Sequence, residues 1–100
     1  MKMALLEYDI DGAHKIYDLS KKCTTIGRGN DADLQFKSDS EMSRRHSSIL
    51  MQDENTFLLR DDNSTNGTQL NDQLLDPATA VPLKDGDEIH VGNTFITFHI

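Results

Sequence analysis

The chain ends in EIHVGNTFITFHI, residues 88–100, and this stretch decides the fold class. Apolar residues alternate with polar ones on both sides of Gly92-Asn93, which is typical of two strands joined by a tight turn. In the second strand Ile96, Phe98 and Ile100 fall on one face, because successive side chains of a strand point to opposite sides. We therefore expect a β-hairpin whose apolar face is directed at a core.

The same alternation recurs through the rest of the chain, and no stretch has the period of an amphipathic helix. Asp11-Gly12 predicts a type I′ turn, and residues 71–80 predict an irregular connection with brief strands. About ten short strands in this length indicate an all-β, two-sheet β-sandwich. Besides the closing hairpin, we expect strands at residues 6–10, 14–19, 23–26, 33–36, 47–51, 56–60 and 81–83.

Length and composition indicate one domain over residues 1–100, since 100 residues leave no room for a second core. The content of 36% hydrophobic and 27% charged residues is that of a folded domain, and no apolar run is long enough to span a membrane. Cys23 has no partner for an internal disulfide, which fits a reducing compartment. We expect a cytoplasmic monomer with no membrane partner.

The charge is unevenly distributed along the chain. The net charge of −7 argues against a nucleic-acid partner. Residues 21–46, however, hold six basic and four acidic residues, so this segment carries +2 and the remainder −9. A basic island on an acidic body suits a small anionic ligand that binds at one place.

Three turns hold the residues with the most distinctive chemistry: Gly27-Arg28, residues 43–46 (SRRH) and residues 63–68 (NSTNGT). Loops at one end of a sandwich lie close together in space, so these turns can converge on one rim. Guanidinium groups, hydroxyls and an amide are donors that suit a phosphate. No nucleophile–base pair or metal cluster accompanies them, so we expect neither an enzyme nor a cofactor.

In this order, the three blocks look like the signature blocks of the forkhead-associated (FHA) domain family. Residues 83–89 (LKDGDEI) and Val91-Gly92 resemble the family's closing pattern, so the resemblance covers nearly the whole chain. It implies a SMAD/FHA-like sandwich of about eleven strands with its ligand loops at one end. It also implies binding of phosphothreonine peptides, hence a partner protein that a Ser/Thr kinase has phosphorylated.

The resemblance also implies roles for single residues. Arg28 would contact the phosphate, Ser43 would donate its hydroxyl to it, and Arg44 would add a second cationic contact. Thr65 would line the site, and Asn66 would hydrogen-bond the peptide backbone beside the phosphothreonine.

Three further matches, Gly27, His46 and Gly67, would shape and brace the loops without touching the ligand. The remaining histidines, His14, His90 and His99, have no metal-ligand spacing, and we interpret them as structural or solvated.

Acidic residues near the blocks depart from the family pattern. Asp61-Asp62 precedes the third block, where the family more commonly has an apolar residue, and carboxylates facing the site would oppose a phosphate. Strand alternation allows at most one of them to face a given side. Glu41 lies two residues before Ser43, so we expect a bias against acidic residues just C-terminal to the phosphothreonine.

Three alternatives remain to be compared with this interpretation. The same fold can serve an interaction without phosphate dependence. Residues 62–73 loosely resemble a calcium loop, but Gln73 stands where a bidentate carboxylate is needed. Ser43 and His46 suggest a hydrolase, but no nucleophile elbow and no orienting acid accompany them.

Overall fold

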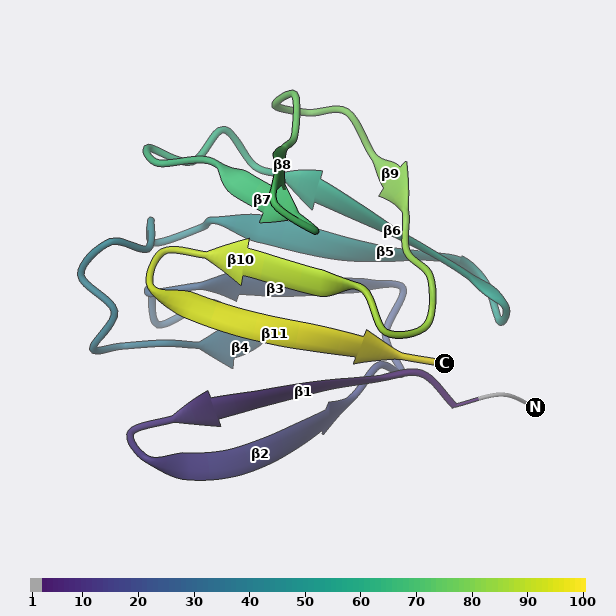
Figure 1. The fold of residues 1–100 in the computed structure, drawn as a ribbon, viewed down its shortest axis with the longest axis horizontal. Coiled ribbons are helices and arrows are strands. Elements are labelled where there is room, and N and C mark those ends of the chain that lie inside the picture. The colour runs from purple at the N-terminus through teal and green to yellow at the C-terminus, as the bar shows by residue number, and fades with distance from the viewer. Residues whose placement is uncertain (1–2) are drawn as a thin grey trace.

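The computed structural model describes residues 3–100, and within them the regular elements are eleven strands and no helix. The strands form two facing sheets (Figure 1), which confirms the predicted all-β sandwich. In chain order they are β1 (Leu5–Ile10), β2 (Ala13–Asp18), β3 (Cys23–Gly27), β4 (Leu34–Gln35), β5 (Ser47–Asp53), β6 (Thr56–Asp61), β7 (Thr68–Leu70), β8 (Gln73–Leu74), β9 (Val81–Pro82), β10 (Glu88–Val91) and β11 (Thr94–His99).

The larger sheet has the order β2-β1-β11-β10-β7-β8 and the smaller one β4-β3-β5-β6-β9. Neighbouring strands are antiparallel, except that β3 and β4 pair in parallel. In the larger sheet β1 inserts beside β11, so the two ends of the described chain are joined by a ladder in which Leu6 faces Phe98.

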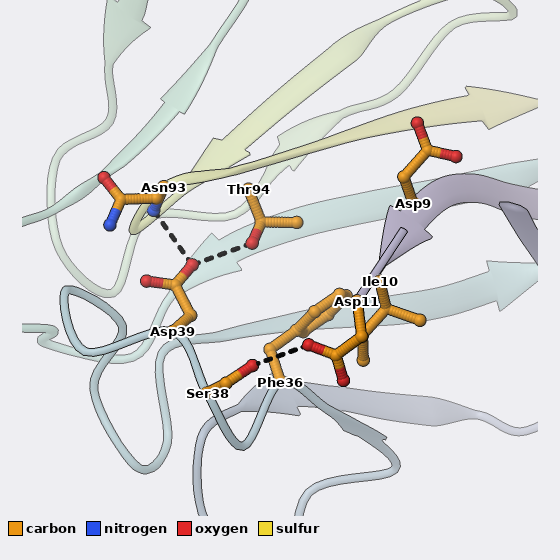
Figure 2. Close-up of a pocket in the computed structure, with 8 residues that line it drawn as sticks. All are labelled: Asp9, Ile10, Asp11, Phe36, Ser38, Asp39, Asn93 and Thr94. Atoms are coloured by element: carbon orange, nitrogen blue, oxygen red, sulfur yellow. Dashed lines mark hydrogen bonds between the residues drawn. The ribbon is translucent and has the colours of Figure 1, made fainter. Parts of the chain in front are cut away.

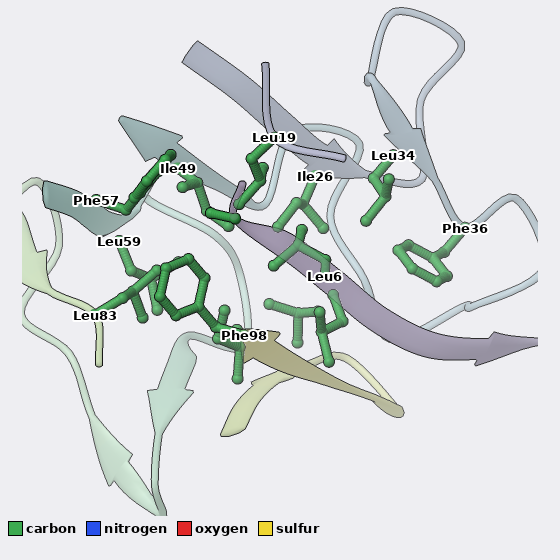
Figure 3. Packing of buried hydrophobic residues seen from close by; sticks show 14 of the residues in the cluster. Leu6, Leu19, Ile26, Leu34, Phe36, Ile49, Phe57, Leu59, Leu83 and Phe98 are labelled. Carbon is green, nitrogen blue, oxygen red and sulfur yellow. The ribbon is translucent and has the colours of Figure 1, made fainter. Parts of the chain in front are cut away.

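The closing hairpin packs its apolar face into the core, as the alternation predicts. Ile96 and Phe98 are fully buried, whereas Phe95 on the other face is half exposed. Phe98 meets Phe57 of the opposite sheet with ring centroids 5.6 Å apart (Figure 3). Each buried side chain of this size stabilises the fold by about 1.5–3 kcal/mol, so this layer holds the sheets together.

Two hairpins use turns with positive φ at both central residues. Asp11 and Gly12 have φ of 49° and 81°, which confirms the predicted turn between β1 and β2. Asn71 and Asp72, with φ of 49° and 69°, join β7 to β8 in the same way. Strand β7 was not predicted, because Thr68–Leu70 is too short to show an alternation and owes its conformation to pairing with β10.

The connections β4–β5 and β6–β7 and the turn β10–β11 lie at one end of the sandwich (Figure 1). The C-terminus and the start of β1 lie at the other end. Within residues 3–100 no helix is long and apolar enough to cross a membrane.

Candidate functional site

The three turns singled out in the sequence meet at one edge of the sandwich. The Arg28 backbone N–H donates to the Ser43 carbonyl at 3.0 Å, which joins the first turn to the second. The Thr65 backbone N–H donates to Ser43 Oγ at 2.9 Å, which joins the third turn to the second. Residues far apart in the sequence are thus held around one centre, Ser43.

Glycine is required where the first two turns touch. A Cβ built on Gly27 would lie 2.0 Å from the Arg44 carbonyl oxygen, far inside van der Waals contact. Gly67 has φ of +84°, and a Cβ there would lie 2.5 Å from Leu74 Cδ1. A side chain at Gly27 would push the backbone of the second turn away, whereas at Gly67 the positive φ itself favours glycine, because the exposed Leu74 side chain can move aside. Both observations support the structural role that the family resemblance implies for these glycines.

His46 lies buried beneath the site and links the second turn to the third. Its ring is buried, and Nδ1 accepts the Ser43 backbone N–H at 3.0 Å. Nδ1 is therefore unprotonated, so Nε2 carries the hydrogen and donates it to the Gly67 carbonyl at 2.8 Å. This neutral tautomer pairs with a backbone group of each loop, the Ser43 N–H and the Gly67 carbonyl. A second hydrogen, on Nδ1, would point at the Ser43 N–H. The geometry supports the bracing role predicted for His46.

Asp61 supports the third turn and does not oppose a ligand. The side chain is buried and accepts the Ser64 and Thr68 hydroxyls, each at 2.6 Å, and the Ser64 N–H at 3.1 Å. Burial raises the pKa of the Asp61 carboxyl, but these hydrogen bonds outweigh it and hold the pKa below its usual range. Asp61 is therefore a charged anchor of the loop that carries Thr65.

Asp62 is neutralised by cations of its own. Its carboxylate accepts Arg60 Nε at 2.9 Å and lies 3.6 Å from Arg45 Nε, and Ser48 also donates to it. Neither member of the acidic pair presents an unpaired carboxylate to the site. Arg44, in contrast to Arg45, has no ion pair among the described residues.

Asp39 is a positioning residue that was not predicted from the sequence. Its carboxylate accepts the Asn93 N–H at 2.9 Å and the Thr94 hydroxyl at 2.7 Å (Figure 2). It also accepts the Glu41 N–H at 3.1 Å. These bonds fix the loop before Ser43 to the β10–β11 turn. The sequence did not reveal this role, because the two partners that tie Asp39 to the other sheet lie 54 and 55 positions away.

A hollow of about 170 Å³ lies beside this anchor. The residues that line it are drawn in Figure 2. Three carboxylates, those of Asp9, Asp11 and Asp39, line it, and Ser38 donates to Asp11 at 2.9 Å. A hollow with this charge repels a phosphate, so the anion site lies elsewhere on the rim.

Two other cavities adjoin at Arg28. The first, of about 330 Å³, is lined by Arg28, Glu41, Ser43, Thr65 and Asn66 among others. It brings together four of the five residues predicted to bind the ligand. The fifth, Arg44, lines a second cavity of about 170 Å³ whose wall also includes Arg28.

The larger cavity contains donors that are free to bind. Arg28 Nε donates to the Met42 carbonyl at 3.0 Å, and its two terminal amino groups have no partner within residues 3–100. Because Ser43 Oγ accepts Thr65 N–H, its own hydrogen is available to a ligand. Asn66 Nδ2 donates to the Glu41 carbonyl at 2.9 Å and to the Glu41 carboxylate at 3.0 Å, which leaves Asn66 Oδ1 free as an acceptor.

Across the described part of the chain, no group of three or more His, Cys, Asp or Glu side chains is arranged to hold a metal ion. The calcium loop considered from the sequence has its Asp62 carboxylate committed to Arg60 and Arg45. The free donors at the rim, the Arg28 amino groups and the Ser43 hydroxyl, suit an anion by their own chemistry.

The FHA domain family model matches residues 24–92. The FHA domain-containing protein FhaA of Mycobacterium tuberculosis is 41% identical over 86 residues, which make up 86% of this chain and 15% of FhaA. The chain therefore belongs to the FHA domain family, and it spans a small part of the length of such relatives.

Solved structures agree with this assignment. A structure from work on phosphothreonine-dependent FHA domain interactions has a TM-score of 0.85 at 37% identity, covering 99% of this chain and 97% of that chain. The N-terminal FHA domain of Saccharomyces cerevisiae Rad53p, in complex with a phosphothreonine peptide, has a TM-score of 0.85 at 29% identity, covering 99% and 94%. FHA domains are binding modules, and this chain has their fold.

Proposed function

We propose that this domain binds phosphothreonine-containing segments of partner proteins in kinase-linked signalling. The observation that carries the proposal is one cavity in which the Arg28 guanidinium and the Ser43 hydroxyl both have unused donors. Arg28 and Ser43 hold the phosphate, Thr65 lines the site, and Asn66 Oδ1 accepts a peptide N–H. Arg44 adds positive charge from the adjoining cavity.

The expected affinity follows from these contacts. A hydrogen bond to a charged group contributes about 1.5–3 kcal/mol net. Two or three such bonds with backbone contacts, less the cost of ordering the peptide, suggest a Kd on the order of micromolar. Burial of the extra methyl group of threonine adds about 0.8 kcal/mol, or roughly fourfold over serine.

In this proposal the domain binds its partner and does not catalyse a reaction. The two sheets share one hydrophobic cluster, which supports treating residues 1–100 as a single domain. Ser43 and His46 do not form a nucleophile–base pair, because Nδ1 of His46 accepts the backbone N–H of Ser43. The domain recruits a partner after a kinase has acted.

Glu41 adds a preference at one side of the phosphate. Its exposed carboxylate lines the same cavity as Ser43 and is held by Asn66 at 3.0 Å. A carboxylate there repels Asp or Glu in the ligand and tolerates Lys or Arg. We place this bias just C-terminal to the phosphothreonine.

A degenerate peptide library tests ligand class and flanking preference together. The library is made with a fixed phosphothreonine, a fixed phosphoserine or a fixed unmodified threonine, and its affinities are compared by fluorescence anisotropy. We expect phosphothreonine to bind tightest and unmodified peptides not to bind, with acidic residues depleted after the phosphothreonine. Equal binding of all three forms would instead favour the phosphate-independent interaction domain, and enrichment of Asp or Glu after the phosphothreonine would refute the role of Glu41.

A further inference from the structure

An apolar hollow lies at the end of the sandwich opposite the three turns. Its volume is about 300 Å³, and it is bounded by the start of β1, the end of β2 and the β5–β6 hairpin (Figure 1). The apolar side chains that line it are Met3, Leu19, Met51 and Phe57. We refer to it as the distal hollow.

The base of the distal hollow is part of the hydrophobic core. Leu19 and Phe57 are almost fully buried, and the Phe57 ring packs against the opposite sheet. The Leu19 N–H donates to the Ala4 carbonyl at 2.9 Å. The Met51 N–H donates to the Lys22 carbonyl at 2.8 Å. These bonds fix the backbone on two sides of the hollow, so its shape is set by the fold before any ligand arrives.

Methionines form the part of the wall that is nearer to solvent. Met3 is 69% exposed, and Met51 is partly buried. An exposed apolar side chain of this size gains free energy when a partner removes it from water. Methionine is unbranched and flexible, so these two side chains can adapt to apolar groups of different shape.

The mouth of the distal hollow is acidic. Asp18 and Glu54 line it and are exposed, and within residues 3–100 neither carboxylate has a cation at salt-bridge distance. Ser20, also in the wall, is uncharged, and Lys22 touches the wall through its backbone without lining the hollow. Because the whole chain carries a net charge of −7, the mouth favours a cationic partner.

We propose that the distal hollow is a docking site for a partner segment in which one large apolar side chain is flanked by Lys or Arg. The apolar side chain enters the hollow, and the flanking cations meet Asp18 and Glu54. An apolar cavity of about 150 Å³ is large enough to hold benzene. A hollow of about 300 Å³ therefore has room for a Phe or Leu side chain.

This docking site goes beyond phosphate binding, because the two sites use opposite ends of the sandwich. Neither ligand blocks the other, so the domain can hold the basic, apolar segment and a phosphothreonine segment at the same time. A partner that carries both segments would gain affinity from the high effective concentration of the second one.

The experiment follows the methionine methyl groups by NMR in isotope-labelled protein. The probes are three capped peptides, Gly-Lys-Phe-Lys-Gly, Gly-Lys-Ala-Lys-Gly and Gly-Glu-Phe-Glu-Gly. Met3 and Met51 report on the distal hollow, and Met42, which is fully buried at the other end, is the internal reference. The proteins are the wild type, Glu54→Gln and the matched control Glu88→Gln, which removes the same charge from an exposed position of β10.

We expect Gly-Lys-Phe-Lys-Gly to shift the Met3 and Met51 signals and not that of Met42. Its Kd should be roughly tenfold lower than that of the Ala peptide, because only the Phe side chain fills the hollow. The Glu-flanked peptide should bind roughly three- to tenfold more weakly than the Lys-flanked one. Glu54→Gln should reduce this preference for Lys, while Glu88→Gln keeps it, and added salt should weaken it in all three proteins.

Equal binding of the Phe and Ala peptides, or unchanged Met3 and Met51 signals, overturns the proposal. The same preference for Lys in Glu54→Gln and Glu88→Gln overturns the role of the acidic mouth. Two other occupants give signals without any peptide, and either one overturns the partner segment. Shifts of Met3 and Met51 that grow with protein concentration indicate a second copy of the chain, and contacts between the Met1 and Met51 methyl groups indicate the chain's own first residues. None of the probes is phosphorylated, so a failure of phosphothreonine binding leaves each of these outcomes as it is.

Discussion

At the scale of single residues, the site depends on donors whose direction is set by other contacts. Arg28 Nε is held by the Met42 carbonyl at 3.0 Å, so the guanidinium plane cannot turn freely. Ser43 Oγ is oriented by the Thr65 N–H that it accepts. Such donors lose little freedom when a ligand arrives, which favours specific binding.

We predict that Arg28→Ala weakens binding of a phosphothreonine peptide by roughly tenfold or more, because at least one charge-assisted hydrogen bond is lost. The fold should remain, since the Arg28 backbone bond to Ser43 is kept. Calorimetry measures the affinity of each protein for the peptide, and circular dichroism measures its melting temperature. The affinity of Arg28→Lys should lie between those of the wild type and Arg28→Ala, because an ammonium group retains the charge but not the planar arrangement of donors. Unchanged affinity in Arg28→Ala would remove Arg28 from the site.

At the scale of elements, the connection β6–β7 is held by a buried carboxylate at the end of β6. The Asp61 carboxylate accepts bonds from Ser64 and Thr68, and Ser47 Oγ extends this network by a bond to Thr68 Oγ1 at 2.6 Å. These bonds fix the start and the end of the loop that bears Thr65. Its order depends on Asp61 being ionised.

We predict that Asp61→Asn destabilises the domain at pH 7 by about 1–3 kcal/mol, because charge-assisted hydrogen bonds are lost and one buried donor is left facing others. The pKa of Asp61 is lowered in the folded protein. Its contribution is therefore fully present above the unfolded value near pH 4 and is lost as the pH falls through the lower folded pKa. Urea unfolding of both proteins from pH 7 to pH 2 tests this.

In that series, the difference in unfolding free energy between wild type and Asp61→Asn should narrow only below about pH 4. Asp33 also contributes to the loss of stability in acid, because its pKa is lowered by Lys21 and by the Thr25 backbone and hydroxyl. It is present in both proteins, so its contribution cancels in the difference between them. A difference that narrows already between pH 7 and pH 5 would assign the effect to a group other than Asp61.

At the scale of the whole molecule, ligand binding and folding respond to acid in separate ranges. The pKa values of Asp61, which anchors the third turn, and of Asp33, which binds Lys21 and Thr25 in the same sheet, are both lowered, so these carboxyls stay ionised well below pH 6. The ligand phosphate takes up its second proton near pH 6. The loss of one ligand charge therefore precedes any loss of the fold.

We predict that phosphothreonine-peptide affinity falls several-fold between about pH 7 and pH 5, because the monoanion bonds less strongly to Arg28 and Ser43. Over the same range the tryptophan-free domain should keep its circular dichroism spectrum and its melting temperature nearly constant. A peptide carrying a non-titrating phosphate analogue serves as the control and should show a smaller pH dependence. Loss of the fold over the same pH range as the loss of binding would contradict the prediction that the two respond to acid in separate ranges.

Much of the sandwich was predictable because strand alternation is a local property. Ile96 and Phe98 are buried as their spacing predicts, and Asp11-Gly12 forms the expected turn. Strand β7 was not predictable, because its three residues become a strand only through β10. The site was predictable as a set of turns, but the separation of Arg44 from Ser43 into different cavities was not.

The sequence by itself determined which faces of the strands are apolar, where the chain turns and which turns hold phosphate-binding chemistry, since each depends on neighbouring residues. Only the tertiary structure decided that Asp61 braces the third turn and that Asp62 pairs with Arg60 and Arg45, where the sequence left open whether one of them faces the site. It also decided that Asp39 ties the loop before Ser43 to Asn93 and Thr94. The physical reason is that a carboxylate's effect depends on the donors that surround it, and here those donors are set by the packing of two sheets.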